Sequence, residues 1–252
     1  MNTIIHTVLT PAQRAAIQSL VAACSAHDHT NLSFPFDDGE LFVFSDKGNG
    51  LADGILSAAA FSLCGADSWD CSAFTHPSLR NQGAFSALLE AGLSKLSREG
   101  SIFFYADPSC QDTMAALSAL HTEHLADEHM MELAPGDFFK AADRIGSTEC
   151  TVSEIPDSAV NTLHITVPDG EVFINCHTAH YYLYGLQIAP DRRGQGLGKL
   201  LLTQTLSRLF LQNPKPVRLQ VSGDNTSALS LYKKTGFRIT ETLSCYLFSY
   251  NR

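Results

Sequence analysis

The chain has 252 residues, of which 44% are hydrophobic and 17% charged, so it is long enough for two globular domains with buried cores. A formal net charge of −9 disfavours nucleic acid and anionic membranes as partners. The amino-terminal segment lacks the basic leader of a signal peptide, and no run approaches the ~18 apolar residues of a membrane span. Seven cysteines without a C-x-x-C pair indicate reduced thiols, so we expect a cytoplasmic protein.

The first element in the chain is a predicted helix that begins at residue 11. Thr10 followed by Pro11 is typical of a helix N-cap and first turn. Gln13 stands at the third helical position, where it completes a capping box.

A glycine-containing motif at residues 76–89, HPSLRNQGAFSALL, returns 113 positions later as APDRRGQGLGKLLL at residues 189–202. A period this long exceeds that of a solenoid and indicates a duplicated domain. In one ungapped frame, nine of twenty positions are identical, among them Pro77 with Pro190, Arg80 with Arg193, Gln82 with Gln195 and Gly83 with Gly196.

Both copies share one predicted order: an apolar strand, the Arg/Gly turn, a helix and a second strand. The helices have leucines on one face, and the second strands are expected at 101–107 and 216–222. A strand–helix–strand unit of this length is a βαβ crossover, so the fold class is mixed α/β. The predicted leucine stripes are Leu89, Leu93 and Leu96 in the first copy and Leu202, Leu206 and Leu209 in the second.

Between the copies, the segment 121–129 contains three histidines, two of which, His121 and His124, have a spacing that can serve metals. No cysteine or carboxylate pattern completes a zinc signature, and H-E-x-x-H is absent, so we expect a solvated turn and no metal. The segment 134–148 then predicts a linker, because Pro135, Gly136 and Gly146 interrupt the patterned regions. The predicted domains are residues 1–138 and 146–252.

The turn of the second copy is suited to binding an anion. A helix N-terminus presents unpaired N–H groups and a positive dipole end, glycines allow close approach, and arginine adds a charge-assisted fork. Two familiar phosphate motifs fail on spacing. A P-loop requires glycine at Arg193 and Ser or Thr at Leu200, and a dinucleotide-binding fingerprint lacks its third glycine.

The stretch resembles the signature Q/R-x-x-G-x-G/A of the GNAT superfamily of acetyl-CoA-dependent N-acetyltransferases, with Arg193, Gly196 and Gly198 in the fixed positions. About thirty residues later, LQVSGDNTSALSLYKKTGF is similar to the next strand and helix of that family. The resemblance covers residues 146–252 and, less completely, the first copy. It implies two tandem GNAT-like domains and a primary amine acceptor, either a small molecule or a protein.

The resemblance also implies how acetyl-CoA binds. Backbone amides from Gln195 to Lys199 would hold the pyrophosphate, and the backbone of residues 186–188 would pair with the pantetheine arm in the manner of an added strand. The predicted cofactor-binding residues are Leu186, Gln187, Ile188, Arg193, Gly194, Gln195, Gly196, Leu197, Gly198, Lys199, Asn225, Ala228 and Tyr232.

Two residues are candidates for the chemistry. Asn225 and Tyr232 are seven positions apart, nearly two helical turns, so they lie near one helix face. The resemblance implies that Tyr232 protonates the departing thiolate and that Asn225 orients the cofactor. The residues alone also allow Tyr232 to be a core-edge tyrosine and Asn225 a helix N-cap.

No general base is identified by the sequence. His177, His180, Glu171 and Tyr184 lie on strands near the predicted cofactor strand, and each is also explained as a cleft wall or a solvent-facing side chain. The family implication for the oxyanion donor is a backbone N–H near Ile188.

The first copy departs from the pattern at two points. Phe85 stands where the second copy has Gly198, and the equivalent of Tyr232 is Ser118 or His121, depending on a gap. We therefore expect a catalytic carboxyl-terminal domain and an amino-terminal domain with a degenerate cofactor motif that walls the acceptor cleft. The alternatives left open are a CoA-binding module without turnover and a different acyl donor or acceptor.

Overall fold

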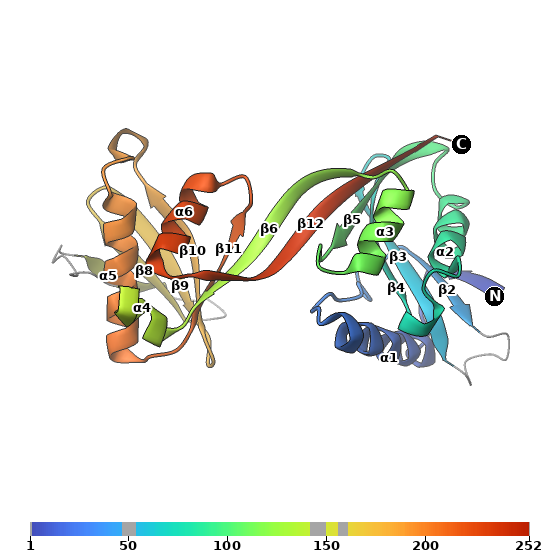
Figure 1. The fold of residues 1–252 in the computed structure, drawn as a ribbon, viewed down its shortest axis with the longest axis horizontal. Coiled ribbons are helices and arrows are strands. Elements are labelled where there is room, and N and C mark those ends of the chain that lie inside the picture. The colour runs from blue at the N-terminus through green and yellow to red at the C-terminus, as the bar shows by residue number, and fades with distance from the viewer. Residues whose placement is uncertain (1, 47–53, 142–149, 156–160, 252) are drawn as a thin grey trace. The chain divides into compact units, whose positions relative to one another are not determined.

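The computed structural model describes residues 2–46, 54–141, 150–155 and 161–251 (Figure 1). The chain forms two compact units: unit 1 comprises residues 1–126 and 243–252, and unit 2 comprises residues 127–242. Each unit is a mixed sheet with helices packed on it, so the predicted α/β class is confirmed. In the described residues, no helix is both long and apolar enough to cross a membrane.

Unit 1 has the strand order β1-β2-β3-β4-β5-β12, in which β4 and β5 are parallel and the other neighbours antiparallel. Its elements are β1 (Asn2–His6), α1 (Pro11–Asp28), β2 (Leu41–Asp46), β3 (Ile55–Gly65), β4 (Ser68–Thr75), the 3-10 turn η2 (Pro77–Leu79), α2 (Ala84–Leu93), β5 (Glu99–Ala106), α3 (Gln111–Ala119) and the carboxyl-terminal part of β12 (Arg238–Asn251).

Unit 2 repeats this topology with the strand order β7-β8-β9-β10-β11-β6, in which β10 and β11 are the parallel pair. Its elements are the greater part of β6 (Glu123–Leu133), α4 (Pro135–Ala141), β7 (Thr151–Ile155), β8 (Thr162–Val167), β9 (Gly170–Cys176), β10 (Tyr181–Ile188), η3 (Pro190–Arg192), α5 (Leu197–Gln212), β11 (Val217–Ser222) and α6 (Thr226–Thr235).

The last strand of each unit comes from the other half of the sequence. Strand β6 follows β5 and α3 in the chain, but its residues 128–133 pair with β11. Strand β12 follows β11 and α6, but its residues 244–251 pair with β5. The units therefore differ from the predicted ranges 1–138 and 146–252, because residues 127–138 belong to unit 2 and residues 243–252 to unit 1.

Local sequence signals set several element boundaries. Thr10 accepts a hydrogen bond from the Gln13 N–H, and Gln13 reaches back to the Thr10 N–H, so the predicted capping box is confirmed. Helix α5 ends at Gln212, before Asn213, as predicted. The predicted linker at 134–148 instead begins with helix α4, whose Phe138 packs edge-on against Phe210 of α5. Its residues 142–149 lie outside the described part.

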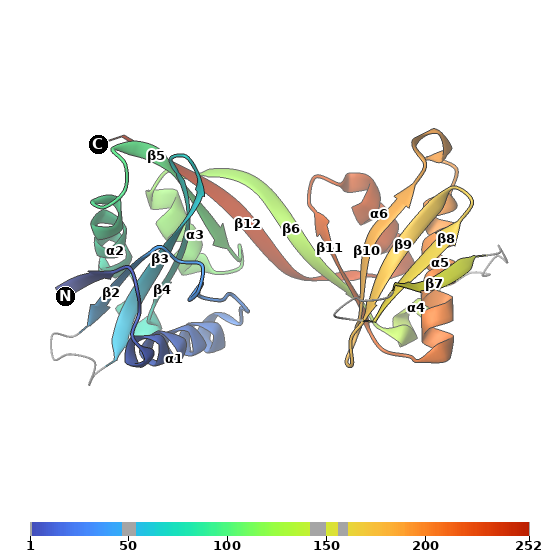
Figure 2. The same cartoon turned by 180° about the vertical axis from the view of Figure 1, so that it is seen from behind.

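The two units differ in how the faces of their sheets are covered. In unit 1, α2 packs on one face through Leu88 and Leu89, and α1 packs on the other through Ile17 and Leu20. In unit 2, α4, α5 and α6 all contribute to one core. Figure 2 shows the strands of unit 2 in front of α5, with no helix drawn over their near face.

The sheet positions that α1 covers in unit 1 have different side chains at their counterparts in unit 2. The strand registers align five apolar residues of unit 1 with mostly polar residues of unit 2. Phe42, Phe44, Ala58, Ala60 and Phe74 correspond to His164, Thr166, Glu171, Phe173 and Gln187, respectively. Within the described residues of unit 2, nothing equivalent to α1 separates β7 from β8. This face of unit 2 is called the open face below.

Candidate active site

The turn between β10 and α5 has the backbone that its glycines permit. Gly194 and Gly196 have φ of +76° and +81°, which is left-handed backbone that side chains disfavour. Arg193 is extended and donates from Nε to the Ile188 carbonyl at 3.1 Å, which ties the turn to the end of β10. A Cβ added to Gly194 or Gly196 would meet no atom within 4 Å, so the space beside the turn is open.

The helix that follows presents unpaired backbone donors. Gly196 is the N-cap of α5, and the first helical hydrogen bond from this end runs from the Leu200 N–H to the Gly196 carbonyl. The amides of Leu197, Gly198 and Lys199 consequently have no intrahelical acceptor. These amides, the positive end of the helix dipole and Arg193 lie together at the turn for which the sequence predicts an anion site.

Beside this turn the parallel strands separate. Strands β10 and β11 pair at Tyr181–Val217 and Tyr182–Arg218 and then diverge. A bulge between Tyr184 and Gln187, with Gly185 at φ +61°, bends β10 further. The opening exposes backbone groups of residues 186–188 along the free edge of β10, where strand addition by an extended ligand is geometrically possible.

The position of Gly198 extends this opening toward α6. A Cβ at residue 198 would lie 3.6 Å from Leu231 of α6 and 3.7 Å from Ile188 of β10, so it points between those two elements. With glycine there, the gap between the strand end and the helix stays clear.

Helix α6 places Asn225 and Tyr232 differently. Asn225 is the N-cap, and its side-chain oxygen accepts from the Ala228 N–H and the Ser227 hydroxyl, which leaves its amide nitrogen as a donor. Tyr232 is buried and packs edge-on against Phe237. Burial raises the pKa of Tyr232, so the phenol stays protonated at neutral pH.

The open face has a carboxylate beside a row of aromatic rings. Glu171 of β9 is bonded to His164 Nε2 at 2.7 Å and also accepts from the side chain of Gln187. These hydrogen bonds, chiefly that of His164, lower the pKa of Glu171. His164 stacks on Phe173 at 4.3 Å, and Phe173 stacks on Tyr184 at 5.4 Å.

The four candidate bases therefore lie in two places. Glu171 and Tyr184 lie on the open face near the bulge. His177 and His180 stack on each other before the start of β10, where Lys215 bonds the His177 carbonyl. Strand β10 separates that end from the turn by about 23 Å of extended chain. Burial lowers the pKa of His180.

The remaining histidine prediction concerns residues 121–129. His121 lies in a turn with φ +56°, whereas His124 is already in β6, with its ring 5.3 Å from that of Tyr246. Among the described residues, no group of three metal-ligating side chains is present.

The turn of the first copy has nearly the same backbone as that of the second. Gly83 has φ and ψ of 80° and 6°, compared with 81° and −1° at Gly196. Arg80 donates from Nε to the Thr75 carbonyl at 3.2 Å, the counterpart of the Arg193–Ile188 bond.

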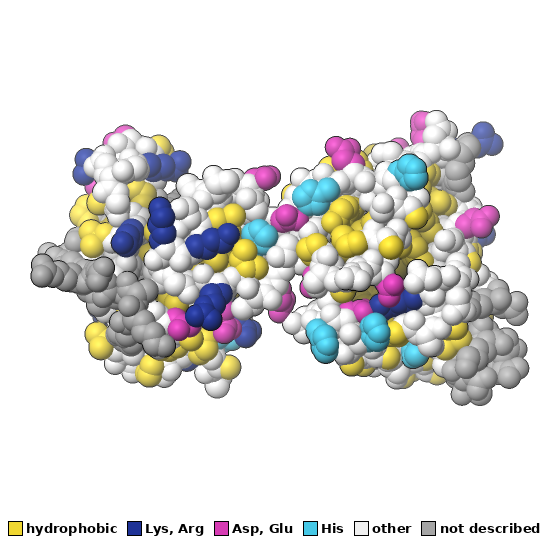
Figure 3. All heavy atoms as spheres, in the orientation of Figure 1, with side chains coloured by type: hydrophobic (Ala, Val, Ile, Leu, Met, Phe, Trp, Pro, Cys, Tyr) yellow, Lys and Arg dark blue, Asp and Glu magenta, His cyan; other side chains and the backbone are white. Residues whose placement is uncertain are grey.

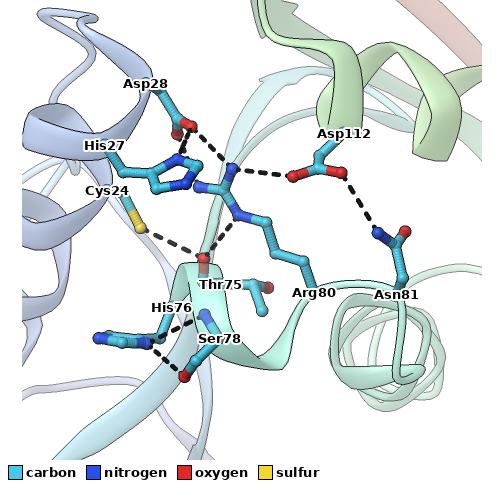
Figure 4. A network of polar contacts seen from close by, with 9 residues as sticks. All are labelled: Cys24, His27, Asp28, Thr75, His76, Ser78, Arg80, Asn81 and Asp112. Carbon is cyan, nitrogen blue, oxygen red and sulfur yellow. Dashed lines mark hydrogen bonds and ion pairs between the residues drawn. The ribbon is translucent and has the colours of Figure 1, made fainter.

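The guanidinium of Arg80, however, is occupied by acidic side chains (Figure 4). Its two terminal nitrogens bind both carboxylate oxygens of Asp28, from α1, at 2.7 and 2.6 Å. Asp112, from the first turn of α3, accepts a longer bond of 3.3 Å from Arg80. The side chains of Arg80 and Asp28 are each 14% exposed. The sequence comparison missed this network, because neither aspartate lies in the motif.

Two further replacements distinguish the first copy. Phe85 packs edge-on against Phe104 of β5, with ring centroids 6.0 Å apart, and so places an aromatic ring where unit 2 has no side chain at Gly198. Aligning the N-caps Cys110 and Asn225 places Leu117, not Ser118 or His121, at the position of Tyr232. The parallel strands β4 and β5 also stay paired further than β10 and β11 do, through Cys71–Phe104. In its described pairing with β3, strand β4 has no bulge at Ser72, the counterpart of Gly185.

The model of the acetyltransferase (GNAT) family matches residues 129–237, and this part of the chain is a GNAT domain. The matched range contains the unit 2 turn, β10, β11 and α6.

Solved structures share the fold of the whole chain. A GCN5-related N-acetyltransferase from Sphaerobacter thermophilus is 13% identical with a TM-score of 0.68, over 99% of this chain and 96% of that one. A tandem GNAT protein from the clavulanic acid biosynthesis pathway is 13% identical with a TM-score of 0.66, over 98% of each chain. The tandem GNAT fold predicted from the duplicated motif is thereby confirmed.

Curated relatives match over a shorter stretch. A mycothiol acetyltransferase from Saccharomonospora viridis is 40% identical over 60 residues, and one from Tsukamurella paurometabola is 39% identical over 67 residues. The matches cover 24% and 27% of this chain and 20% and 23% of those relatives, so the chain spans about a fifth of the length of the curated relatives it matches.

Proposed function

We propose that the chain is an acetyl-CoA-dependent N-acetyltransferase whose active site lies in unit 2 and that unit 1 has lost the corresponding cofactor site. The observation that supports this most directly is the contrast between the turn at Gly83 in unit 1 and the turn at Gly196 in unit 2, which have nearly the same backbone conformation. In unit 2 the arginine side chain bonds the Ile188 carbonyl and a glycine follows at residue 198, whereas in unit 1 the arginine is paired with Asp28 and Phe85 replaces that glycine.

In this proposal, the cofactor is held mainly by backbone. The amides from Gln195 to Lys199, with Arg193 and Gly194, bind the pyrophosphate, and the edge of residues 186–188 pairs with the pantetheine arm. Gly198 leaves the passage between Ile188 and Leu231 clear for that arm. Ala228 and the Asn225 amide nitrogen contact the cofactor from α6.

Acetyl-CoA supplies an activated acyl group. When the amine attacks, negative charge develops on the carbonyl oxygen and then on the departing thiolate, and the protein has to stabilise both. A backbone N–H near Ile188 donates to the developing oxyanion. Tyr232 donates its phenolic proton to the departing thiolate, for which a buried phenol with a raised pKa is in the required protonated form.

The acceptor amine is proposed to approach over the open face. The ionised Glu171 accepts a hydrogen bond from the ammonium group, and the rings of Phe173 and Tyr184 supply a surface that favours cations. His164 donates from Nε2 to the second oxygen of Glu171 and so holds the carboxylate in place, while the proton that the amine loses leaves to water. The name of the curated relatives, mycothiol acetyltransferase, supports acetyl transfer and leaves the acceptor to be found by assay.

The direct test is thiol release from acetyl-CoA by the full chain with a panel of primary amines. Each amine is paired with its N,N-dimethyl counterpart, which has the same charge and no N–H to lose after attack. Release with primary amines and none with the tertiary partners is expected. Saturable CoA binding without release for any amine would support a binding module and contradict the proposal.

All seven cysteines are free, which supports the further proposal of a reducing, cytoplasmic location. Disulfides between these cysteines in protein isolated in the presence of an alkylating agent would contradict it.

A further inference from the structure

Unit 1 contains a cavity at the place that corresponds to the cofactor site of unit 2. Its volume is about 310 Å³, at the lower end of the range for small-molecule sites. The walls are apolar side chains of β4, α2, β5 and α3, including Phe85, Phe104 and Leu117. Asp28, Arg80 and Asp112 also line it. Figure 3 shows a hollow in unit 1 with acidic side chains beside a basic one.

This cavity is poorly suited to CoA. Arg80, the counterpart of the phosphate-binding arginine, already has both terminal nitrogens on Asp28. A pyrophosphate beside the turn would face the carboxylates of Asp28 and Asp112 at short range, which costs free energy in a partly buried site. Phe85 adds a ring to the wall of the cavity at the position where unit 2 has Gly198.

Among the side chains that line the cavity, two are carboxylates and one is a guanidinium. Asp28 and Asp112 together face the single guanidinium of Arg80, and Asp28 takes its bidentate contact. Asp112 has one 3.3 Å bond from Arg80 and one 3.2 Å bond from Asn81, and its side chain is 41% exposed. An ionised carboxylate accepts about four hydrogen bonds, so Asp112 retains acceptor capacity toward the cavity.

The thiol of Cys110, also in the cavity lining, is consistent with this negative surplus. Burial raises its pKa most, the nearby carboxylates of Asp28, Asp107 and Asp112 raise it further, and Arg80 offsets part of the rise. A cation is therefore favoured over an anion at the same place, with uncharged apolar walls behind it.

We propose that the unit 1 cavity binds a small organic cation, an ammonium group on an apolar body, with the ammonium on Asp112 and the body between Phe85 and Leu117. The duplicated cofactor site has in this way become a site for a ligand of opposite charge. A ligand of about ten non-hydrogen atoms suits the volume, and its expected dissociation constant lies between about 10 μM and 1 mM.

The test is methyl NMR of the full chain, observing Ala106, Ala116 and Leu117 in the cavity and Leu229 and Leu231 in unit 2. The probes are 2-phenylethylamine, its uncharged analogue 2-phenylethanol and the anion 3-phenylpropanoate. We expect saturable shifts of the cavity methyls with the amine, about tenfold weaker binding of the alcohol and none of the anion.

The variant D112N should weaken binding of 2-phenylethylamine about tenfold while the cavity resonances keep their positions. E90Q is the matched control, because it removes a carboxylate from the exposed side of α2 in the same unit and should leave the affinity unchanged. Equal binding of the amine and the alcohol, or no saturation by the amine at about 10 mM, overturns the proposal.

Acetyl-CoA provides the remaining comparison. Shifts of the cavity methyls by acetyl-CoA would show a retained cofactor site and would also overturn the proposal. The readout is binding in unit 1, so it stands whether or not thiol release is found in unit 2.

Discussion

The turns around Gly83 and Gly196 have nearly the same backbone conformation but differ in the side chains that surround them. Both have an extended arginine that bonds the end of the preceding strand, a left-handed glycine N-cap and free amides at the start of a helix. Glycine and a side-chain-to-carbonyl bond maintain this geometry. What the turn can hold depends on neighbours contributed by other elements, because Asp28 and Asp112 pair with the guanidinium of Arg80, whereas Arg193 bonds a backbone carbonyl.

The helix α1 accounts for much of the difference. In unit 1 it supplies Asp28 to the turn and covers Phe42, Ala58 and Phe74 on the sheet. In unit 2 the matching face has no such helix among the described residues and contains Glu171 and Gln187. The difference of one helix thus separates the two copies both at the turn proposed to bind phosphate and at the face on which we propose that the acceptor binds.

The largest expected effect on activity is at Tyr232, whose position in unit 1 is taken by Leu117. The variant Y232F should lower kcat about 100-fold with nearly unchanged acetyl-CoA affinity, because the buried phenol is the proposed proton donor to the thiolate. Stopped-time thiol release and calorimetric binding measure the two quantities. An unaltered kcat would remove Tyr232 from the mechanism.

The next comparison exchanges the residues at the gap. The variant G198F should raise the KM for acetyl-CoA about 30-fold, because a ring between Ile188 and Leu231 closes the passage. The reverse change, F85G, should give no acetyl-CoA binding in unit 1, because Arg80 remains paired with Asp28. Binding by unit 1 in F85G would mean that Phe85 alone separates the two copies.

The arginines offer a matched pair. The variant R193A should raise the KM for acetyl-CoA about tenfold, which is the order expected for loss of one charge-assisted phosphate contact. R80A should leave that KM unchanged and instead lower the free energy of unfolding by about 2 kcal/mol, because Asp28 loses its partner. The idea fails if the two variants change KM equally.

On the open face, E171Q should raise the KM for the amine about fivefold and leave that for acetyl-CoA unchanged. Because its neighbours lower the pKa of Glu171, the carboxylate stays charged to a pH below the ordinary glutamate range near 4.3. Amine binding should therefore show no step between pH 5 and 7 from this group. A step in that window would assign the amine contact to another residue.

The smallest effect is on acid stability. Arg80 lowers the pKa of Asp28 in the folded chain. The stabilisation is therefore complete above the ordinary aspartate value near 3.9 and is lost as the pH falls through the lower folded value. Denaturant unfolding of D28N should show about 2 kcal/mol less stability at pH 7 and a smaller loss below pH 4 than the unaltered chain. Parallel curves would show that the pair adds no stability.

Several features were predictable because they depend on nearby residues. The capping box at Thr10, the end of α5 before Asn213 and the strands at 101–107 and 216–222 follow from local preferences, and the structure confirms them. The leucine stripe of α5 is buried as predicted, but α2 ends at Leu93, before Leu96. Helix α4 was missed because its proline and glycine occupy the first helical positions, where they are tolerated.

The roles of single residues were less accessible to sequence analysis. Phe85 was identified as the change to inspect, but whether its ring lies in the passage depends on its contact with Phe104. Glu171 and His164 are seven positions apart on adjacent strands, a pairing set by the β8–β9 register. Glu171 was one of four candidate bases named from the sequence, but its hydrogen bond with His164 was not predicted.

The sequence by itself determined that this protein is a duplication, that each copy has a glycine turn at a helix N-terminus and that the second copy is the intact one. Repeats, glycine positions and helix caps are local signals, so they can be read without coordinates. Only the tertiary structure decided that β6 and β12 exchange partners and that Asp28, 52 positions from Arg80, occupies its guanidinium. Those features depend on contacts between distant residues, and the spacing within a motif does not specify them.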